Sequence, residues 1–302
     1  MKKLMTITMV LMMVFLTACS MESPFVKDES GDNGNVKIGL SVSTLNNPFF
    51  VSLRDAIVAD AEAKGYEIIV VNAQDDAATE ISGIEDLIQQ NVDVLLVNPT
   101  DSAAVSSAVQ SANNAGIPVI TIDRSADKGE VETLITSDNV AGGEMAADYI
   151  LENIGEDAKV AEIEGIAGAS ATRERGKGFH QIADDHLQIV ASQPADFDRT
   201  KGLTVMENTL QGNGDIQAVF AHNDEMALGA LEAIKAAGKD IVVIGFDGVE
   251  DAIASVEAGE LTATIAQQPD LMGQEAVSAV EKVLNGEKLE EIIKVPLELK
   301  TK

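Results

Sequence analysis

The sequence predicts an α/β fold made of two doubly wound parallel-sheet lobes with a ligand cleft between them. From residue 36 onward, short apolar runs rich in Val and Ile alternate with longer Ala-rich segments of helical spacing. Strand, helix and strand at such intervals form right-handed βαβ units, which build parallel sheets. The same alternation starts again near residue 159, and two α/β halves of comparable size favour two lobes over one large sheet.

The first half of the folded region contains five predicted strands. Several are nearly continuous apolar blocks, which is typical of strands covered on both faces. They are KIGLSVS (37–43), YEIIVVNA (66–73), VDVLLVNP (92–99), IPVITID (117–123) and the weaker ETLITSD (132–138). Helices are expected between them over 49–64, 77–90 and 102–115, and Gly65 and Gly116 stand where two of these helices stop.

The second half repeats this order with another five predicted strands. They are KVAEIEG (159–165), LQIVASQPA (187–195), IQAVFAHND (216–224), IVVIGFDG (241–248) and LTATIAQ (261–267). Helical stretches again separate the strands. One of them covers residues 224–237, and Asp224 is its expected N-cap, because a carboxylate at that position can accept a free amide hydrogen of the first turn.

The first nineteen residues predict export and lipid anchoring. Lys2 and Lys3 precede a short uncharged run, and a basic start, an apolar stretch and a small residue before the cut are typical of an export signal. The run is shorter than the roughly 20 apolar residues that span a bilayer. Its Leu-Thr-Ala-Cys ending resembles the lipobox of bacterial lipoproteins. This resemblance implies a signal peptide over 1–18, a lipidated Cys19, and an extracytoplasmic protein that is tied to the cell membrane.

Residues 19–35 form a polar, glycine-containing segment without periodicity, which predicts a flexible tether. As a coil it would reach about 20 Å, enough to hold a folded body clear of the lipid headgroups. Cys19 is the one cysteine of the chain, so no intramolecular disulfide can form and stability must come from packing.

Charge excludes one class of partner. The chain has 50 Asp and Glu against 21 Lys and Arg, a formal net charge of −29. This charge opposes binding to nucleic acid, which carries the same sign. The 3 His residues show no metal-ligand spacing, so neither a metal nor another cofactor is expected.

Polar and aromatic side chains follow the predicted strands, at the edge where open α/β sheets bind ligands. The first half supplies Asn46, Asn47, Phe49, Phe50, Asn98, Asp101, Asp123 and Arg124. The second half supplies Arg173, Arg175, Phe197, Asn223, Asp224, Asp247 and Gln267. Flat rings suit the C–H faces of a sugar, while amides, carboxylates and guanidinium groups suit its hydroxyls, which both donate and accept. Core packing for each Phe, and structural ion pairs for the Asp–Arg neighbours, are the simpler alternatives.

The charges of this set point to a neutral ligand. Two carboxylates, Asp123 and Asp247, are balanced by two guanidinium groups, Arg124 and Arg175. A phosphorylated sugar would call for an excess of positive charge or a glycine-rich cradle.

Eight segments together resemble the periplasmic ribose-binding proteins of sugar ABC importers. They are VSTLNNPFF, VNPTD, TIDR, EGIAGASATRERG, QPADFDR, HNDEMALGA, GFDG and TIAQQPD, and the resemblance runs from residue 36 to the C-terminus. It implies that eleven of the strand-end residues grip a pentose: Asn47, Phe49, Phe50, Asn98, Asp123, Arg124, Arg175, Phe197, Asn223, Asp247 and Gln267. It also implies two lobes joined by a three-segment hinge, which close around the sugar and are then recognised by an ABC permease in the membrane.

The hinge crossings are expected near 137–138, 267–268 and 295–296. They divide the folded body into an N-terminal lobe, 36–138 plus 268–295, and a C-terminal lobe, 139–267 plus 296–302. The expected function is extracytoplasmic binding of a neutral monosaccharide by a monomer, with D-ribose as the first candidate, and delivery to the permease.

The sequence leaves three alternative functions to consider. The ligand could be another sugar, such as allose, galactose, xylose or a furanose-like signal. A sugar-responsive transcriptional regulator would need an N-terminal helix-turn-helix and a basic face, whereas this chain begins with an export signal and is acidic. An enzyme is the third alternative, but no G-x-S-x-G, H-E-x-x-H, Walker or G-x-G-x-x-G motif occurs.

Overall fold

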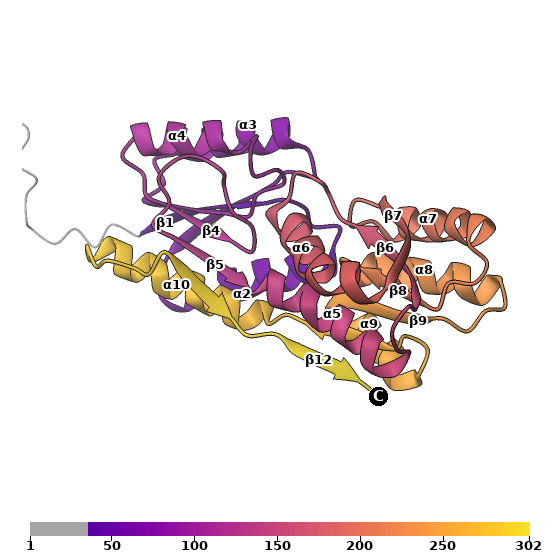
Figure 1. Cartoon of the computed structure of the whole chain (residues 1–302). Coiled ribbons are helices and arrows are strands. Elements are labelled where there is room, and N and C mark those ends of the chain that lie inside the picture. The colour runs from indigo at the N-terminus through magenta and orange to yellow at the C-terminus, as the bar shows by residue number, and fades with distance from the viewer. Residues whose placement is uncertain (1–35) are drawn as a thin grey trace, which may run out of the picture. The chain divides into compact units, whose positions relative to one another are not determined.

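The computed structural model describes residues 36–302, so the predicted signal peptide, Cys19 and the tether lie outside the described residues. Two six-stranded sheets make up the described part, each with helices on both faces (Figure 1). This arrangement confirms the predicted α/β fold of two doubly wound lobes.

The first sheet has the order β11-β5-β4-β3-β1-β2, and all its strand pairs are parallel. Its strands are β1 (Lys37–Val42), β2 (Glu67–Asn72), β3 (Val94–Val97), β4 (Val119–Ile122), β5 (Thr133–Ser137) and β11 (Ile292–Val295). Four helices cover it: α2 (Pro48–Ala63), α3 (Ala77–Gln89), α4 (Ser106–Asn114) and α10 (Pro269–Leu284). Figure 1 shows α3 and α4 on one face of this sheet and α2 and α10 on the other.

The second sheet repeats the order as β12-β10-β9-β8-β6-β7. Its strands are β6 (Lys159–Glu164), β7 (Gln188–Pro194), β8 (Ala218–Ala221), β9 (Val242–Asp247), β10 (Ala263–Ala266) and β12 (Glu298–Thr301). Only β12 runs antiparallel to its neighbour. The helices of this half are α5 (Asn139–Asn153), α6 (Ser170–His186), α7 (Arg199–Gly212), α8 (Asp224–Ala236) and α9 (Glu250–Ala258).

The central strands are apolar at successive positions because helices cover both faces of each sheet. In β8, Ala218 and Phe220 pack with the side chains of α5 and α6, while Val219 and Ala221 belong to the cluster on the opposite face. Successive side chains of a strand point to opposite faces, so a central strand needs apolar residues at every position. The predicted apolar strand at 216–224 is thus confirmed as β8, a central strand that is covered on both faces.

The C-terminal strands β11 and β12 were not predicted. Each is four residues long, with polar residues among the apolar ones, and each lies at the edge of its sheet. β11 joins the first sheet through β5, and β12 joins the second through β10, so the chain crosses between the sheets around Pro296. Short edge strands carry little periodicity, and only their pairing partners define them.

The start of α4 and the N-cap of α8 differ from the predicted ones. α4 begins at Ser106 instead of residue 102, because Asp101 Oδ1 accepts the amide hydrogens of Ala103 and Ala104 in a preceding turn. The N-cap of α8 is Asn223, whose side chain accepts the Met226 amide hydrogen at 3.0 Å. Asp224 as the N-cap is therefore wrong, and its carboxylate has other partners.

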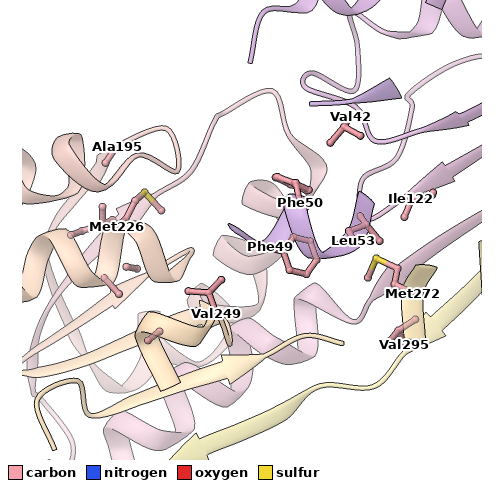
Figure 2. Close-up of a cluster of buried hydrophobic side chains, with 14 of the residues drawn as sticks. Val42, Phe49, Phe50, Leu53, Ile122, Ala195, Met226, Val249, Met272 and Val295 are labelled. Atoms are coloured by element: carbon pink, nitrogen blue, oxygen red, sulfur yellow. The ribbon is translucent and has the colours of Figure 1, made fainter. Parts of the chain in front are cut away.

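Two rings of α2 are anchored in a large apolar cluster. Phe49 and Phe50 start this helix and pack with its Leu53 and with Met272 of α10 (Figure 2). Asn47 caps the helix by accepting the Phe49 amide hydrogen at 2.9 Å, and Pro48 is its first residue. The cap fixes where the helix begins, and the helix start then holds both rings at the carboxyl end of β1.

Candidate sugar-binding site

A cavity of about 210 Å³ lies between the carboxyl ends of the two sets of strands. Its lining residues come from both halves of the fold: Asn47, Phe49, Phe50, Asp123, Arg124, Ala171, Arg175, Phe197, Asp247 and Gln267. Side chains from both halves therefore face one common cavity.

Nine of the eleven residues predicted from the sequence line this cavity. The tenth lining residue, Ala171, was missed, because a small apolar side chain carries no chemical signal in a sequence. The two predicted residues that do not line the cavity are Asn98 and Asn223. Both are buried behind it and bind the residues that do line it.

Asn98 joins two loops of the first half. Its Oδ1 accepts hydrogen bonds from the Ser43 amide and hydroxyl at 3.2 and 2.7 Å. Its amide nitrogen donates to the Ile122 carbonyl at 3.1 Å and lies 3.4 Å from Asp123 Oδ2. In the second half, Asn223 donates to the Phe197 carbonyl at 3.3 Å. Both amides hold cavity-lining residues in place.

Arg124 forms one wall of the cavity. Its guanidinium lies 4.9 Å from the ring centre of Phe50 and 5.1 Å from that of Phe197, so rings from both halves flank it. It donates to the Pro99 carbonyl at 3.0 Å, and its Nε lies 3.5 Å from Asp123 Oδ2. Such cation–π contacts keep the guanidinium plane fixed while leaving its edge free to donate hydrogen bonds.

Arg175 occupies the corresponding place in the second half. Its Nη1 donates to the His222 carbonyl at 2.5 Å and lies 3.6 Å from Asp247 Oδ1. Its Nε donates to Asn139 at 2.9 Å, and the guanidinium stacks 3.7 Å from the ring centre of Phe246. Four contacts of this kind define one orientation for a side chain that is otherwise long and mobile.

The two carboxylates are buried and have raised pKa values. Burial raises the pKa of Asp247 to about 7, against the opposing effect of the Arg175 charge. Burial also raises the pKa of Asp123, opposed first by Arg124. Within residues 36–302, Asp123 Oδ1 and Gln267 Oε1 have no hydrogen-bond partner. Because unpartnered buried oxygens are rare in proteins, these atoms are suited to accept hydrogen bonds from a ligand.

Three cavity residues have left-handed backbone conformations. The φ angles are +65° for Asp123, +61° for Phe197 and +117° for Asp247. None of these residues is glycine, so each conformation costs free energy, on the order of 1–3 kcal/mol. Strain of this kind is concentrated at functional sites, where it sets the direction of a side chain.

The two halves touch each other beside the cavity. The Ser102 amide donates to the Gly168 carbonyl at 3.0 Å, and the Ser125 amide donates to Ser170 Oγ at 2.9 Å. These contacts join loops of the first half to the segment between β6 and α6. The cavity is therefore enclosed by both halves at once.

A second, wider cavity adjoins the first and shares Asn47, Phe50, Arg124 and Phe197 with it. Its volume is about 520 Å³. Four further carboxylates line it: Asp75, Asp196, Asp198 and Glu225. The one additional cation of its lining, Arg199, is already bonded to Glu225. An anionic ligand would meet repulsion here.

Within residues 36–302, every helix is too short or too polar to cross a membrane.

A family model, curated relatives and a solved structure all indicate the same protein family for this chain. A family model of the periplasmic binding protein domain matches residues 38–288. The chain is 60% identical over 303 residues to a ribose import binding protein of Bacillus subtilis, covering 100% of this chain and 99% of that one. It is 55% identical over 265 residues to that of Escherichia coli, covering 87% and 89%. A solved solute-binding protein of Bacillus halodurans with bound myo-inositol has a TM-score of 0.85 at 33% identity, covering 90% and 96%.

Proposed function

This chain belongs to the periplasmic binding protein family, and we propose that it binds a neutral monosaccharide outside the cytoplasm and delivers it to an ABC permease. D-ribose is the first candidate, since two ribose import binding proteins are 60% and 55% identical to this chain. One observation carries the proposal above all. Charged, amide and aromatic side chains from both sheets converge on a single cavity of about 210 Å³.

The chemistry of the cavity suits a sugar. Phe49, Phe50 and Phe197 supply apolar surface for the C–H faces of a ring. Asp123 and Asp247 accept hydrogen bonds from hydroxyls, while Arg124 and Arg175 donate to them, and hydrogen bonds to charged groups contribute roughly 1.5–3 kcal/mol each. Each carboxylate lies beside a guanidinium, and the adjoining acidic cavity disfavours sugar phosphates and sugar acids.

Binding is coupled to closure of the two lobes. A ligand that bonds to residues of both lobes has more contacts in the closed state than in the open one, and this difference in affinity shifts the equilibrium toward closure. The contacts of Ser102 and Ser125 with the segment 168–170 then add direct bonds between the lobes. The closed form is the state that the permease would recognise.

We place the lobe boundaries at the three crossings near 137–138, 267–268 and 295–296. The N-terminal lobe then comprises 36–138 plus 268–295, and the C-terminal lobe comprises 139–267 plus 296–302. The pairing of β11 with β5 and of β12 with β10 supports the last crossing.

We also propose that Cys19 carries a lipid and that the protein acts as an anchored monomer. Support comes from the Leu-Thr-Ala-Cys sequence and the polar segment that follows it. An anchored receptor stays near its permease, which raises its effective concentration there.

The site is proposed to bind its sugar without converting it. Each carboxylate that could act as an acid or base lies beside a guanidinium, Asp123 beside Arg124 and Asp247 beside Arg175. All four groups are then used to hold hydroxyls. Detectable turnover or isomerisation of a bound sugar by the purified protein would contradict this part of the proposal.

Isothermal titration calorimetry of residues 20–302 with a panel of pentoses and hexoses tests the ligand. D-ribose is expected to bind most tightly, with allose, galactose, xylose and myo-inositol weaker, because a buried polar group left without its hydroxyl costs much of the affinity. Tighter binding of another sugar would keep the binding class and replace ribose. Absence of binding to every sugar of the panel would overturn the proposed function.

A further inference from the structure

Asp224 has no role in capping its own helix. Asn223 supplies the cap of α8, and the Asp224 side chain turns away from the first turn into the interior, where it is completely buried. A buried carboxylate is costly unless several donors satisfy it. Its hydrogen bonds therefore indicate what it does.

The Asp224 carboxylate links three separate segments of the second half. Oδ2 accepts the amide hydrogens of Gly248 at 2.7 Å and Val249 at 2.9 Å, and Oδ1 accepts the Thr264 hydroxyl at 2.6 Å. The first two donors lie in the turn after β9, and the third lies on β10. The start of α8 is thus tied to both strands that end at the cavity.

Space for this carboxylate depends on a glycine. A β-carbon on Gly245 of β9 would lie 2.1 Å from Asp224 Oδ1. The backbone angle of Gly245 is not left-handed, so the glycine is needed here for room and not for conformation. The absence of a side chain at Gly245 therefore leaves the space in which the Asp224 carboxylate packs against β9.

The turn held by Asp224 begins with a cavity residue. Asp247 lies directly before the two amides that Asp224 binds, and it has a φ of +117°, followed by +75° at Gly248. A non-glycine residue keeps such a conformation only when its surroundings impose it. The two hydrogen bonds to Asp224 supply that restraint, while Gln267 donates to Asp247 Oδ1 at 2.9 Å from the cavity side.

We infer that Asp224 is a positioning residue for sugar binding, which holds the 247–249 turn so that the Asp247 carboxylate faces the ligand. The inference rests on the proposed function, because it assigns Asp247 to a sugar hydroxyl. Asp224 itself lies outside the cavity lining and acts through Asp247.

The test is a double-mutant cycle between Asp224 and Asp247, with D-ribose as the probe and calorimetry as the measurement. Asp224→Ala is expected to weaken ribose binding about tenfold or more, because two buried amides lose their acceptor and the turn relaxes. Asp224→Asn is the matched control. Its amide oxygen can still accept from both backbone amides and its NH₂ can donate to Thr264 Oγ1, so affinity is expected to stay within about threefold of wild type.

The decisive comparison is made in the Asp247→Asn background. There, Asp224→Ala is expected to cause no further loss, because a positioning residue acts only through the group that it positions. The same tenfold loss in both backgrounds would overturn the inference, and so would unchanged affinity in Asp224→Ala. A merely structural role would lower the unfolding temperature without such coupling.

Two arrangements keep the outcome unambiguous. If Asp224→Ala does not fold, Thr264→Val takes its place in the same cycle, since it removes one donor to the carboxylate and keeps the size of the side chain. A loss of affinity with Thr264→Val in the wild-type background alone supports the inference, and an equal loss in both backgrounds overturns it. Failure of the wild-type protein to bind any sugar would instead contradict the proposed function.

Discussion

A β-carbon on Gly168 would lie 1.9 Å from Asp101 Oδ2, so these two residues can meet only because one of them is glycine. Gly168 precedes α6 in the second half, and Asp101 follows β3 in the first. The adjacent Ser102 amide donates to the Gly168 carbonyl at 3.0 Å. Neither Gly168 nor Asp101 lines the sugar cavity. This contact between the two lobes therefore lies outside the cavity lining.

Gly168→Ala is expected to weaken ribose binding about tenfold or more while leaving the unfolding temperature of the sugar-free protein nearly unchanged. The added methyl group clashes with Asp101 when the lobes are closed and has room when they are apart. Since only the closed state grips the sugar from both sides, its smaller population lowers the apparent affinity. Calorimetry and thermal unfolding measure the two effects separately.

Gly212→Ala is the control for this substitution, because a β-carbon there would meet no atom within 4 Å. The double variant Gly168→Ala with Asp101→Ala should recover part of the affinity relative to Gly168→Ala alone, because it lacks the carboxylate that the added methyl group would meet. Equal affinity of Gly168→Ala and wild type would show that the clash is relieved without opening the lobes.

Asp123→Ala is expected to lower ribose affinity about 100-fold, since it removes a charged acceptor whose Oδ1 is otherwise without a partner in the described residues. The fold should persist, because Arg124 keeps its bond to Pro99 and its contacts with two rings. Calorimetry at high sugar concentration gives the affinity. Asp240→Ala removes the same charge at an exposed position and should bind ribose normally. Normal binding by Asp123→Ala would remove this residue from the site.

Glu80 is expected to make folding stability fall as the pH rises toward neutrality. It is buried in α3, its Oε2 accepts the Thr100 amide hydrogen at 2.9 Å, and burial raises its pKa from 4.5 to about 7. Between these two pH values the folded chain keeps a proton that the unfolded chain has lost, so each step up in pH favours unfolding. The full effect is at most about 3 kcal/mol, reached above pH 7.

Glu80→Gln isolates this effect, because its amide oxygen can still accept from Thr100 and it does not titrate. Urea unfolding of both proteins at pH 5 and pH 8 measures the difference. The wild-type protein should lose more stability than Glu80→Gln over this interval. Identical losses would show that Glu80 titrates at an ordinary pH in the folded protein.

Cys19→Ala is expected to release the protein from the membrane or leave it with an uncleaved signal, while ribose binding by the purified body stays normal. The Cys19 sulfur is the atom that would carry the lipid, and Cys19 precedes the first residue of the predicted lobes in the sequence. Mass spectrometry of the membrane fraction checks for the lipid directly. An unmodified cysteine in the wild-type protein would contradict the anchoring proposal.

The prediction placed residues in the cavity lining best where local structure next to a strand end determines which way a side chain points. Asn47, Phe49 and Phe50 follow β1 at a capped helix start, so their placement is set within a few residues. Asn98 and Asn223 follow strands in the same way, yet their amides turn back to hold Asp123 and Phe197. Whether a strand-end amide faces the cavity or supports a neighbour depends on groups distant in sequence.

Two doubly wound lobes and nine of the residues that line the cavity could be predicted from the residue pattern and the family resemblance. Strand periodicity and strand-end position are local properties, so a linear sequence retains them. Three features appear only in the folded chain: the edge strands β11 and β12, the contact of Gly168 with Asp101, and the burial of Asp224 under the Asp247 turn. Each of these is a meeting of segments far apart in the chain, and its geometry follows from close packing, which no single segment encodes.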